Sequence, residues 1–131
     1  MSPTGDGELI LVVDDEAPVR QIVRRILERY GYRVLLAADG AEALALFALH
    51  GDEVSLVLTD MMMPVMDGMA TIEQLRALRP GLRIIAASGL ATDERIAAAA
   101  ALGVTDFLPK PYTLDTVLQR VHEVLGRSAT H

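Results

Sequence analysis

Several apolar runs of this sequence end in side chains that are capable of polar chemistry. Three acidic residues, Asp14, Asp15 and Glu16, follow ELILVV (residues 8–13), and Asp60 follows VSLVLT (residues 54–59), just before a cluster of methionines. If these runs are parallel strands, their carboxyl ends meet at one edge of a sheet. The side chains that would meet there are Asp14, Asp15, Asp60, Ser88 and Lys110.

This set of side chains suits a divalent cation and phosphoryl transfer. Neighbouring carboxylates repel one another unless a hard cation lies between them, and Mg²⁺ is the usual choice beside a phosphate, with Mn²⁺ as a second candidate. A carboxylate at such a site can attack phosphorus and form an acyl phosphate. The ammonium of Lys110 would then neutralise phosphoryl oxygens. Asp60 is therefore a candidate metal ligand and a candidate nucleophile.

The elements that would position these residues alternate along the chain. Short apolar or β-branched runs predict strands, and the stretches between them carry helix start and stop signals. Pro18 and Gly31 bracket the first predicted helix, Asp39 with Glu42 forms a capping-box start for the second, and Thr113 can cap the fifth. The five predicted strands are residues 8–13, 34–38, 54–59, 83–88 and 105–108.

The predicted helices repeat apolar residues at intervals of three and four, which places those residues on one helix face. Arginines occupy the other face of the first helix. The stripe of the first helix is Val19, Ile22, Val23, Ile26, Leu27 and Tyr30; that of the third is Met69, Ile72, Leu75 and Leu78; that of the fifth is Leu114, Val117, Leu118, Val121, Val124 and Leu125.

Strands that alternate with helices indicate right-handed crossovers and an α/β fold. We expect one doubly wound, five-stranded parallel sheet with helices on both faces. The chain has 131 residues, enough for one domain. We place this domain at residues 8–126, between a linker or disordered N-terminus at 1–7 and a C-terminal tail at 127–131.

Composition excludes several classes of protein. A hydrophobic fraction of 51% and a charged fraction of 23% indicate a globular chain, and a net charge of −6 argues against direct binding of nucleic acid or anionic membrane. There is no cysteine, hence no disulfide or thiolate metal site. The N-terminus has no signal-peptide pattern, and no apolar run approaches the about 18 residues of a membrane helix. These features agree with a cytoplasmic location.

Four segments in order, VVDDE, DMMMPVMDG, AASG and FLPKP, make the chain similar to a known family. It resembles the receiver domains of response regulators in bacterial two-component phosphorelays, over about residues 8–126. The resemblance implies the flavodoxin-like (βα)5 fold and transfer of a phosphoryl group from a phosphohistidine to an aspartate. It implies no enzyme activity beyond the domain's own phosphorylation and dephosphorylation, although the parent protein can still be a histidine kinase.

The same resemblance implies a role for each matching residue. Asp60 would be the phosphoacceptor, and Mg²⁺ would be held by Asp14, Asp15, Asp60 and the backbone carbonyl of Met62. Ser88 and Phe107 would be the switch residues, with Ser88 and Lys110 also at the catalytic site. Pro64, Gly68 and Pro111 would shape the loops.

The sequence departs from the family pattern at three positions. The switch aromatic is often tyrosine, whereas Phe107 has no hydroxyl. Met62 and Leu90 are apolar where some relatives have polar side chains. Since apolar side chains do not orient an attacking water, we expect slow self-dephosphorylation.

Each residue also has a purely structural interpretation. Asp14 and Asp15 can be charges at a helix N-terminus, Asp60 an Asx-turn residue, Ser88 a cap and Phe107 a core residue. Two other functions are consistent with parts of the sequence. A Cu(I) site of Met61, Met62, Met63 and Met66 is disfavoured because consecutive methionines cannot all face one ion. A nucleotide-binding enzyme is disfavoured because VVDDEAP has acid where a glycine-rich loop would stand.

The expected partner is a histidine kinase or a histidine phosphotransfer domain. The final segment, KPYTLDTVLQRVHEVLGR, resembles the receivers at the C-terminus of hybrid histidine kinases, which is the context we expect. A stand-alone regulator that acts by docking to a partner is the alternative. A dimer through the fourth helix, fifth strand and fifth helix is a further expectation.

Overall fold

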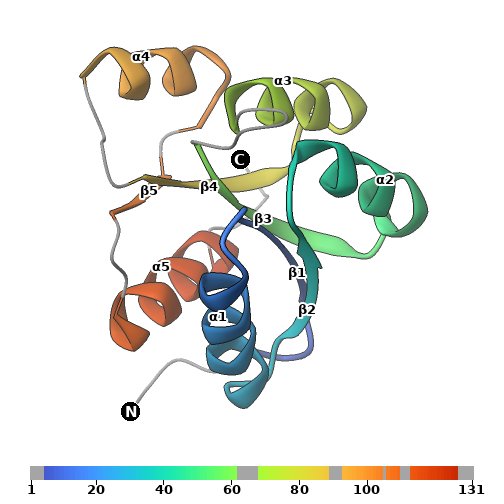
Figure 1. Cartoon of the computed structure of the whole chain (residues 1–131), viewed down its shortest axis with the longest axis vertical. Helices are drawn as coiled ribbons and strands as arrows, with labels where there is room; N and C mark the ends of the chain where they lie inside the picture. Colours follow the sequence, from blue (N-terminus) through green and yellow to red (C-terminus); the bar gives the residue numbers. More distant parts are fainter. Residues whose placement is uncertain (1–4, 62–67, 89–92, 105, 110–112, 127–131) are drawn as a thin grey trace.

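The computed structural model describes residues 5–61, 68–88, 93–104, 106–109 and 113–126. Within these ranges strands and helices alternate, as the sequence predicts (Figure 1). The strands are β1 (Leu9–Val13), β2 (Arg33–Ala37), β3 (Val54–Asp60), β4 (Arg83–Ser88) and β5 (Asp106–Pro109). The helices are α1 (Ala17–Arg29), α2 (Gly40–His50), α3 (Gly68–Leu78), α4 (Asp93–Ala101) and α5 (Leu114–Gly126).

The strands form one parallel sheet in the order β2-β1-β3-β4-β5. From β1 the chain first moves outward to β2 and then crosses back to β3 on the other side. The strand order therefore reverses between β1 and β3, and in open α/β sheets this is where ligands bind. The expected flavodoxin-like (βα)5 fold is confirmed.

Two apolar clusters cover the two faces of the sheet. Helices α1 and α5 supply Val23, Leu27 and Val117 to one cluster, and helices α2, α3 and α4 lie on the opposite face (Figure 1). Strand β1 contributes to both: Ile10 and Val12 point to the first cluster, and its remaining residues to the second. Such burial on both faces explains why β1 is an unbroken apolar run.

The predicted helix ends are found in the described part of the chain. The Asp39 carboxylate accepts a hydrogen bond from the Glu42 amide at 2.8 Å. The Glu42 carboxylate reaches back to the amide of Ala38, one residue earlier than in the usual capping box. Gly31 follows α1 with φ +95°, a conformation that suits glycine. Thr113 accepts a hydrogen bond from the Thr116 amide at 3.2 Å.

The structure corrects some details of the predicted pattern. Strand β2 begins and ends one residue earlier than predicted, and Asp60 is the last residue of β3 rather than the first after it. Ile22 and Leu78 were predicted on core-facing stripes, but their side chains are 57% and 62% exposed. Val23 faces the sheet, and Ile22, which differs from it by about 100° in direction, points to solvent. Leu78 is the last residue of α3, where the helix ends.

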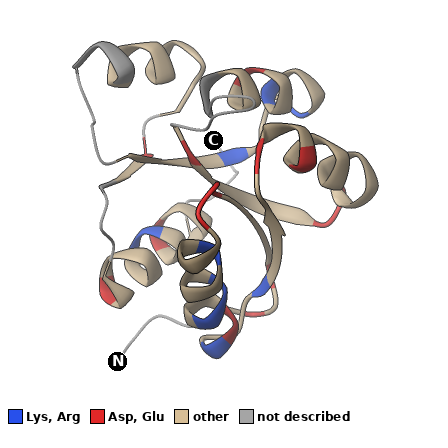
Figure 2. Cartoon of the chain, viewed as in Figure 1, with Lys and Arg blue, Asp and Glu red and all other residues tan. Residues whose placement is uncertain are grey.

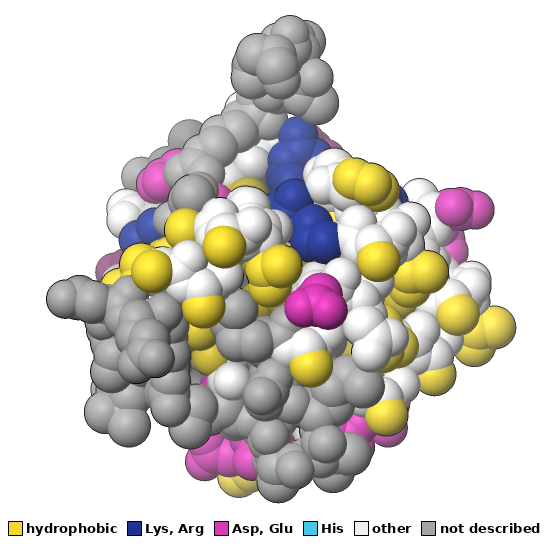
Figure 3. All heavy atoms as spheres, turned by 90° about the horizontal axis from the view of Figure 1, so that it is seen from above, with side chains coloured by type: hydrophobic (Ala, Val, Ile, Leu, Met, Phe, Trp, Pro, Cys, Tyr) yellow, Lys and Arg dark blue, Asp and Glu magenta, His cyan; other side chains and the backbone are white. Residues whose placement is uncertain are grey.

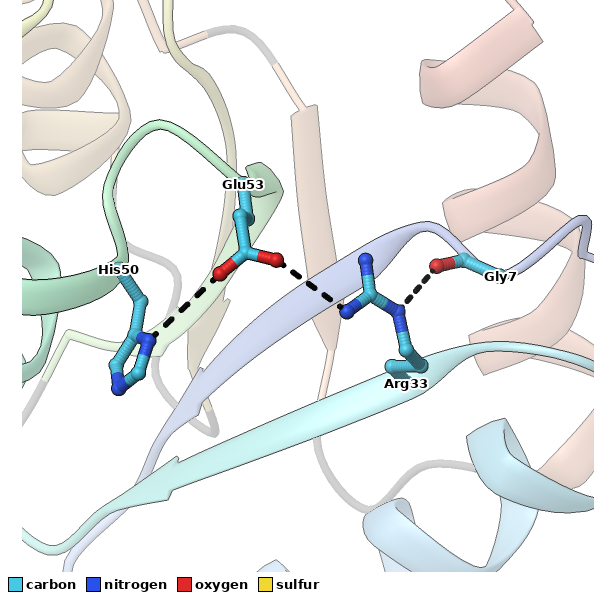
Figure 4. A network of polar contacts seen from close by, with 4 residues as sticks. All are labelled: Gly7, Arg33, His50 and Glu53. Carbon is cyan, nitrogen blue, oxygen red and sulfur yellow. Dashed lines mark hydrogen bonds and ion pairs between the residues drawn. The ribbon is translucent and has the colours of Figure 1, made fainter.

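A polar network joins three segments at the edge where the strands begin (Figure 4). Arg33 donates a hydrogen bond to the carbonyl of Gly7 at 2.7 Å and pairs with Glu53 at 3.6 Å, and His50 lies 3.8 Å from the same carboxylate. The amide of Gly7 also donates to the carbonyl of Gly31. Because Arg33 and Glu53 are more than half exposed, their pairing adds little stability.

None of the helices in the described ranges has both the length and the apolar character that a membrane span requires.

Candidate functional site

The register of the sheet brings several strand ends to one level. Val13 of β1 pairs with Thr59 of β3, so the residues that follow them, Asp14 and Asp60, are neighbours across the two strands. Asp60 pairs in turn with Ala87 of β4. Ser88, the next residue, therefore ends β4 at the same edge. The predicted convergence of polar side chains is thus a direct consequence of parallel pairing.

Asp14, Asp15 and Asp60 form the acidic cluster. Each offers a carboxylate oxygen, and these oxygens all lie within 4.8 Å of one another. Asp14 and Asp60 are buried, with 1% and 5% exposure, whereas Asp15 is exposed. Figure 2 shows the acidic ends of β1 and β3 next to each other at the centre of the carboxyl edge. The cluster thus has two carboxylates beneath the surface and one that opens to solvent.

Hydrogen bonds hold the acidic cluster in place. The amide of Asp14 donates to the carbonyl of Ala37 at 3.1 Å, which extends the β1–β2 ladder by one step. One Asp14 carboxylate oxygen accepts from the Glu16 amide at 2.9 Å, and the Asp14 carbonyl accepts from the Arg20 guanidinium at 2.7 Å. The backbone on which Asp14 and Asp15 stand is therefore fixed by β2 and by the first turns of α1.

The backbone around Asp60 is held by β3 and β4. The amide of Met61 donates to the carbonyl of Ala87 at 2.9 Å, and the buried Thr59 hydroxyl donates to the Asp60 carbonyl at 3.1 Å. Sequence reasoning missed the positioning roles of Thr59 and Arg20. A signal was present for Arg20, which stands six residues after Asp14 near the start of a helix.

The donor set of the acidic cluster fits a hard divalent cation. Carboxylate oxygens are the ligands that Mg²⁺ prefers, and Mg²⁺ commonly takes one or two carboxylates and completes its shell with water and phosphate. Three carboxylates within 4.8 Å, two of them buried, repel one another strongly in the low dielectric of the interior unless a cation is bound. The cluster is therefore typical of a Mg²⁺ site.

The other residues predicted for the site fall into two groups. Ser88 is buried at 3% exposure at the end of β4, and Phe107 of β5 is half-buried against the cluster under α2, α3 and α4. Gly68 is the first residue of α3. Met62, Pro64, Leu90, Lys110 and Pro111 lie outside the described residues.

The structure argues against the two other functions. Met61 is buried at 3% exposure within the apolar cluster, so its thioether packs in the core. Met62, Met63 and Met66 lie outside the described residues. The β1–α1 connection, where a glycine-rich phosphate loop would stand, carries Asp14 and Asp15 instead.

A sequence family described as "Response regulator receiver domain" matches residues 10–122 of this chain. The chain belongs to this family. It is a phospho-accepting receiver domain of a two-component system, which confirms the resemblance found in the VVDDE, DMMMPVMDG, AASG and FLPKP segments.

Three known proteins illustrate the similarity. The response regulator MprA of Mycolicibacterium vanbaalenii is 42% identical over 120 residues, which cover 91% of this chain and 51% of that protein. This receiver chain thus spans about half the length of the curated relatives that it matches.

Two solved structures share its fold. CheY in a CheX-CheY-BeF3-Mg²⁺ complex from Borrelia burgdorferi has a TM-score of 0.84 at 29% identity, over 88% of this chain and 87% of that chain. The receiver domain of the hybrid histidine kinase CckA has a TM-score of 0.76 at 35% identity, over 89% and 98% of the two chains.

Proposed function

We propose that Asp60 of this receiver domain accepts a phosphoryl group from the phosphohistidine of a histidine kinase or phosphotransfer domain. The observation that carries the proposal is the position of Asp60 within 4.8 Å of Asp14 and Asp15, at the point where the strand order reverses. A carboxylate that only closed a turn would have no need of two further carboxylates at its side.

The proposed reaction is a displacement at phosphorus. An oxygen of the Asp60 carboxylate attacks phosphorus while the bond from phosphorus to the histidine nitrogen breaks, and the electron pair of that bond stays on the imidazole. The product is an acyl phosphate on Asp60. The β3–β4 ladder and the Thr59 hydrogen bond keep the Asp60 backbone fixed, so little reorganisation is required.

Asp14 and Asp15 would hold Mg²⁺ together with Asp60 and the carbonyl of Met62, and Mn²⁺ can replace it in such an oxygen-rich site. Bound Mg²⁺ supplies positive charge that offsets the negative charge of the carboxylates and the phosphoryl oxygens. We propose that Lys110, which follows β5 in the chain, adds a second positive charge.

The proposed output is a change on the face formed by α4, β5 and α5. Ser88 ends β4, which pairs with β5, the strand of Phe107. A phosphoryl oxygen on Asp60 would accept a hydrogen bond from the Ser88 hydroxyl, and Phe107 would turn toward the space that the hydroxyl leaves. Pro64 and Pro111 would shape the neighbouring loops. The same face is our candidate for dimerisation.

For the parent protein, we propose a cytoplasmic response regulator rather than a hybrid histidine kinase. Relatives named response regulators match 91% of the chain at 42% identity, which supports this context. The similarity of the CckA receiver keeps the hybrid-kinase hypothesis as the second candidate. The receiver boundaries that we propose remain 8–126.

Acetyl phosphate with Mg²⁺ tests the proposed reaction without a partner kinase. We expect intact-protein mass spectrometry to find one added phosphoryl group on the wild type and none on Asp60→Asn. Asp52→Asn, which changes an exposed carboxylate in the α2–β3 turn, is the matched control and should be labelled like the wild type. Equal labelling of Asp60→Asn would disprove the assignment.

A further inference from the structure

The outward face of α2 is unusually apolar for a helix at the surface of a monomer. Helix α2 reads GAEALALFALH, and Glu42 is its one Asp, Glu, Lys or Arg residue. Its exposed side chains include Ala41, Ala45, Ala48 and Leu49, and Leu49 is 77% exposed. A helix that is apolar on all sides is usually buried. The core covers only one side of α2, so the other side is suited to contact with another molecule.

Helix α3 continues this apolar surface. Ala77 and Leu78 are exposed at its end, and Leu78 has an exposed fraction of 62%. Figure 3 shows hydrophobic and uncharged surface over α2 and α3, next to a group of basic side chains and an acidic one. We call the exposed Ala48, Leu49, Ala77 and Leu78, together with the edge of Phe47, the α2–α3 patch.

A hollow of about 220 Å³ opens in the α2–α3 patch. The apolar side chains that line it are Phe47, Ala48, Leu49 and Leu78, and Gly51, Asp52 and Arg79 complete the lining. An apolar cavity of about 150 Å³ accommodates a benzene-sized group, so this hollow can receive one leucine or phenylalanine side chain. Exposed leucines around such a hollow are typical of a groove that binds an apolar anchor.

The charges around the α2–α3 patch are mostly negative. Glu73 is exposed on α3, four residues before Ala77, and Asp52 lines the hollow itself, while Glu42 is exposed in the first turn of α2, farther from the patch. Two arginines also lie at this end of α3, and both direct their guanidinium groups to backbone carbonyls: Arg79 donates to Gly51 and Val54, and Arg76 donates to Pro80 and Gly103. A second copy of this chain would bring the same acidic surroundings and be repelled. A partner with basic residues beside its apolar anchors would be attracted.

We propose that the α2–α3 patch is a docking site for a basic amphipathic helix of another protein. Its leucine or phenylalanine side chains, spaced three and four residues apart, would contact Leu49 and Leu78, and one of them would fill the hollow. Its lysines or arginines would face Asp52 and Glu73. The patch lies near the end of α2 that precedes β3, at the edge of the sheet opposite the acidic cluster, so docking does not depend on phosphorylation of Asp60.

A pair of synthetic helical peptides tests this proposal. Both carry leucines at helical spacing; one has lysines beside them and the other has glutamates. We expect the lysine peptide to shift the amide resonances of residues 45–53 and 76–79 in the wild-type domain. The glutamate peptide should bind at least tenfold more weakly because the acidic residues repel it.

Matched variants locate the contact. Leu49→Ser and Leu78→Ser should each weaken binding of the lysine peptide at least tenfold. Ile22→Ser, which changes a leucine-sized side chain of 57% exposure on α1, should leave binding unchanged. Equal binding of both peptides, binding that survives both leucine substitutions, or no binding at millimolar peptide would overturn the proposal. So would a dimer in sedimentation that Leu49→Ser dissociates, because the occupant would then be a second copy.

Discussion

Ser88 is buried at the end of β4, one residue beyond the position that pairs with Asp60. Ser88→Ala removes the hydroxyl but keeps the small size of the side chain. We expect phosphorylation of Asp60 to remain, while the spectral change that beryllofluoride causes in α4, β5 and α5 falls by at least half. Amide spectra of both proteins with and without beryllofluoride measure this. Identical changes in the two proteins would mean that Ser88 does not couple Asp60 to that face.

Met62 is the second residue after Asp60 and cannot orient a water for attack on an acyl phosphate. Met62→Asn would supply an amide that can do so. We expect self-dephosphorylation to be about tenfold faster in this variant, within the range that a positioned polar group contributes to catalysis. The decay of radiolabelled phosphoprotein measures it. A variant that decays no faster than the wild type would show that another feature sets the lifetime.

Tyr32 makes the folding stability of the domain depend on alkaline pH, independently of the acidic cluster. Burial, with smaller contributions from Glu8 and Asp6, raises the pKa of its hydroxyl above the ordinary value of 10.0. The unfolded chain therefore loses this proton at a lower pH than the folded chain. Stability is fully present below that ordinary pKa and falls as the pH rises through the folded pKa. Urea unfolding at several alkaline pH values measures this effect. In Tyr32→Phe the free energy of unfolding should fall less with rising pH than in the wild type; an equal fall would mean that other groups cause it.

Helix α3 is tied to the α2–β3 turn by one side chain. Arg79 donates to the carbonyls of Gly51 and Val54 and lies 6.0 Å from the centre of the Phe47 ring. Arg79→Ala leaves these carbonyls without this donor, and we expect a loss of about 1–3 kcal/mol in the free energy of unfolding. Arg79→Lys should lose less stability than Arg79→Ala, because the lysine ammonium can still donate to a carbonyl, although it lacks the two-pronged geometry of the guanidinium. Urea denaturation measures these losses, with Arg25→Ala, at an exposed position of α1, as the control. Equal losses of stability in Arg79→Ala and Arg25→Ala would show that the Arg79 hydrogen bonds do not stabilise the fold.

The elements were predictable because their signals are local. Apolar runs buried on both faces, Asp39 at a helix start and Gly31 at a helix end each act through neighbours in the chain. The exposure of Ile22 and Leu78 was not predictable, because it depends on how each helix is rotated on the sheet. The acidic cluster lies between these cases: strand ends in the sequence predicted Asp14 and Asp60 at one edge, but only the parallel register brings their oxygens within 4.8 Å.

The acidic cluster also influences the stability of the whole domain. Without a cation, repulsion among Asp14, Asp15 and Asp60 opposes folding, and a cation that binds only the folded chain stabilises it. Mg²⁺ at a hundredfold excess over its Kd should add about 2.7 kcal/mol to the free energy of unfolding. We expect Asp15→Asn to be at least as stable as the wild type in EDTA and to gain less from Mg²⁺. Thermal unfolding in EDTA and in Mg²⁺ measures both stabilities. If Mg²⁺ stabilises Asp15→Asn and the wild type equally, Asp15 is not a ligand.

The central claim, that Asp60 is the phosphoacceptor, is tested most directly by locating the acyl phosphate in the chain. Borohydride reduces an aspartyl phosphate to homoserine, so the modified position can be read by peptide mass spectrometry after phosphorylation with Mg²⁺ and acetyl phosphate. We predict homoserine at position 60 alone, dependent on Mg²⁺ and absent in Asp60→Asn. Homoserine at position 14 or 15, or labelled protein with no homoserine at position 60, would contradict the account.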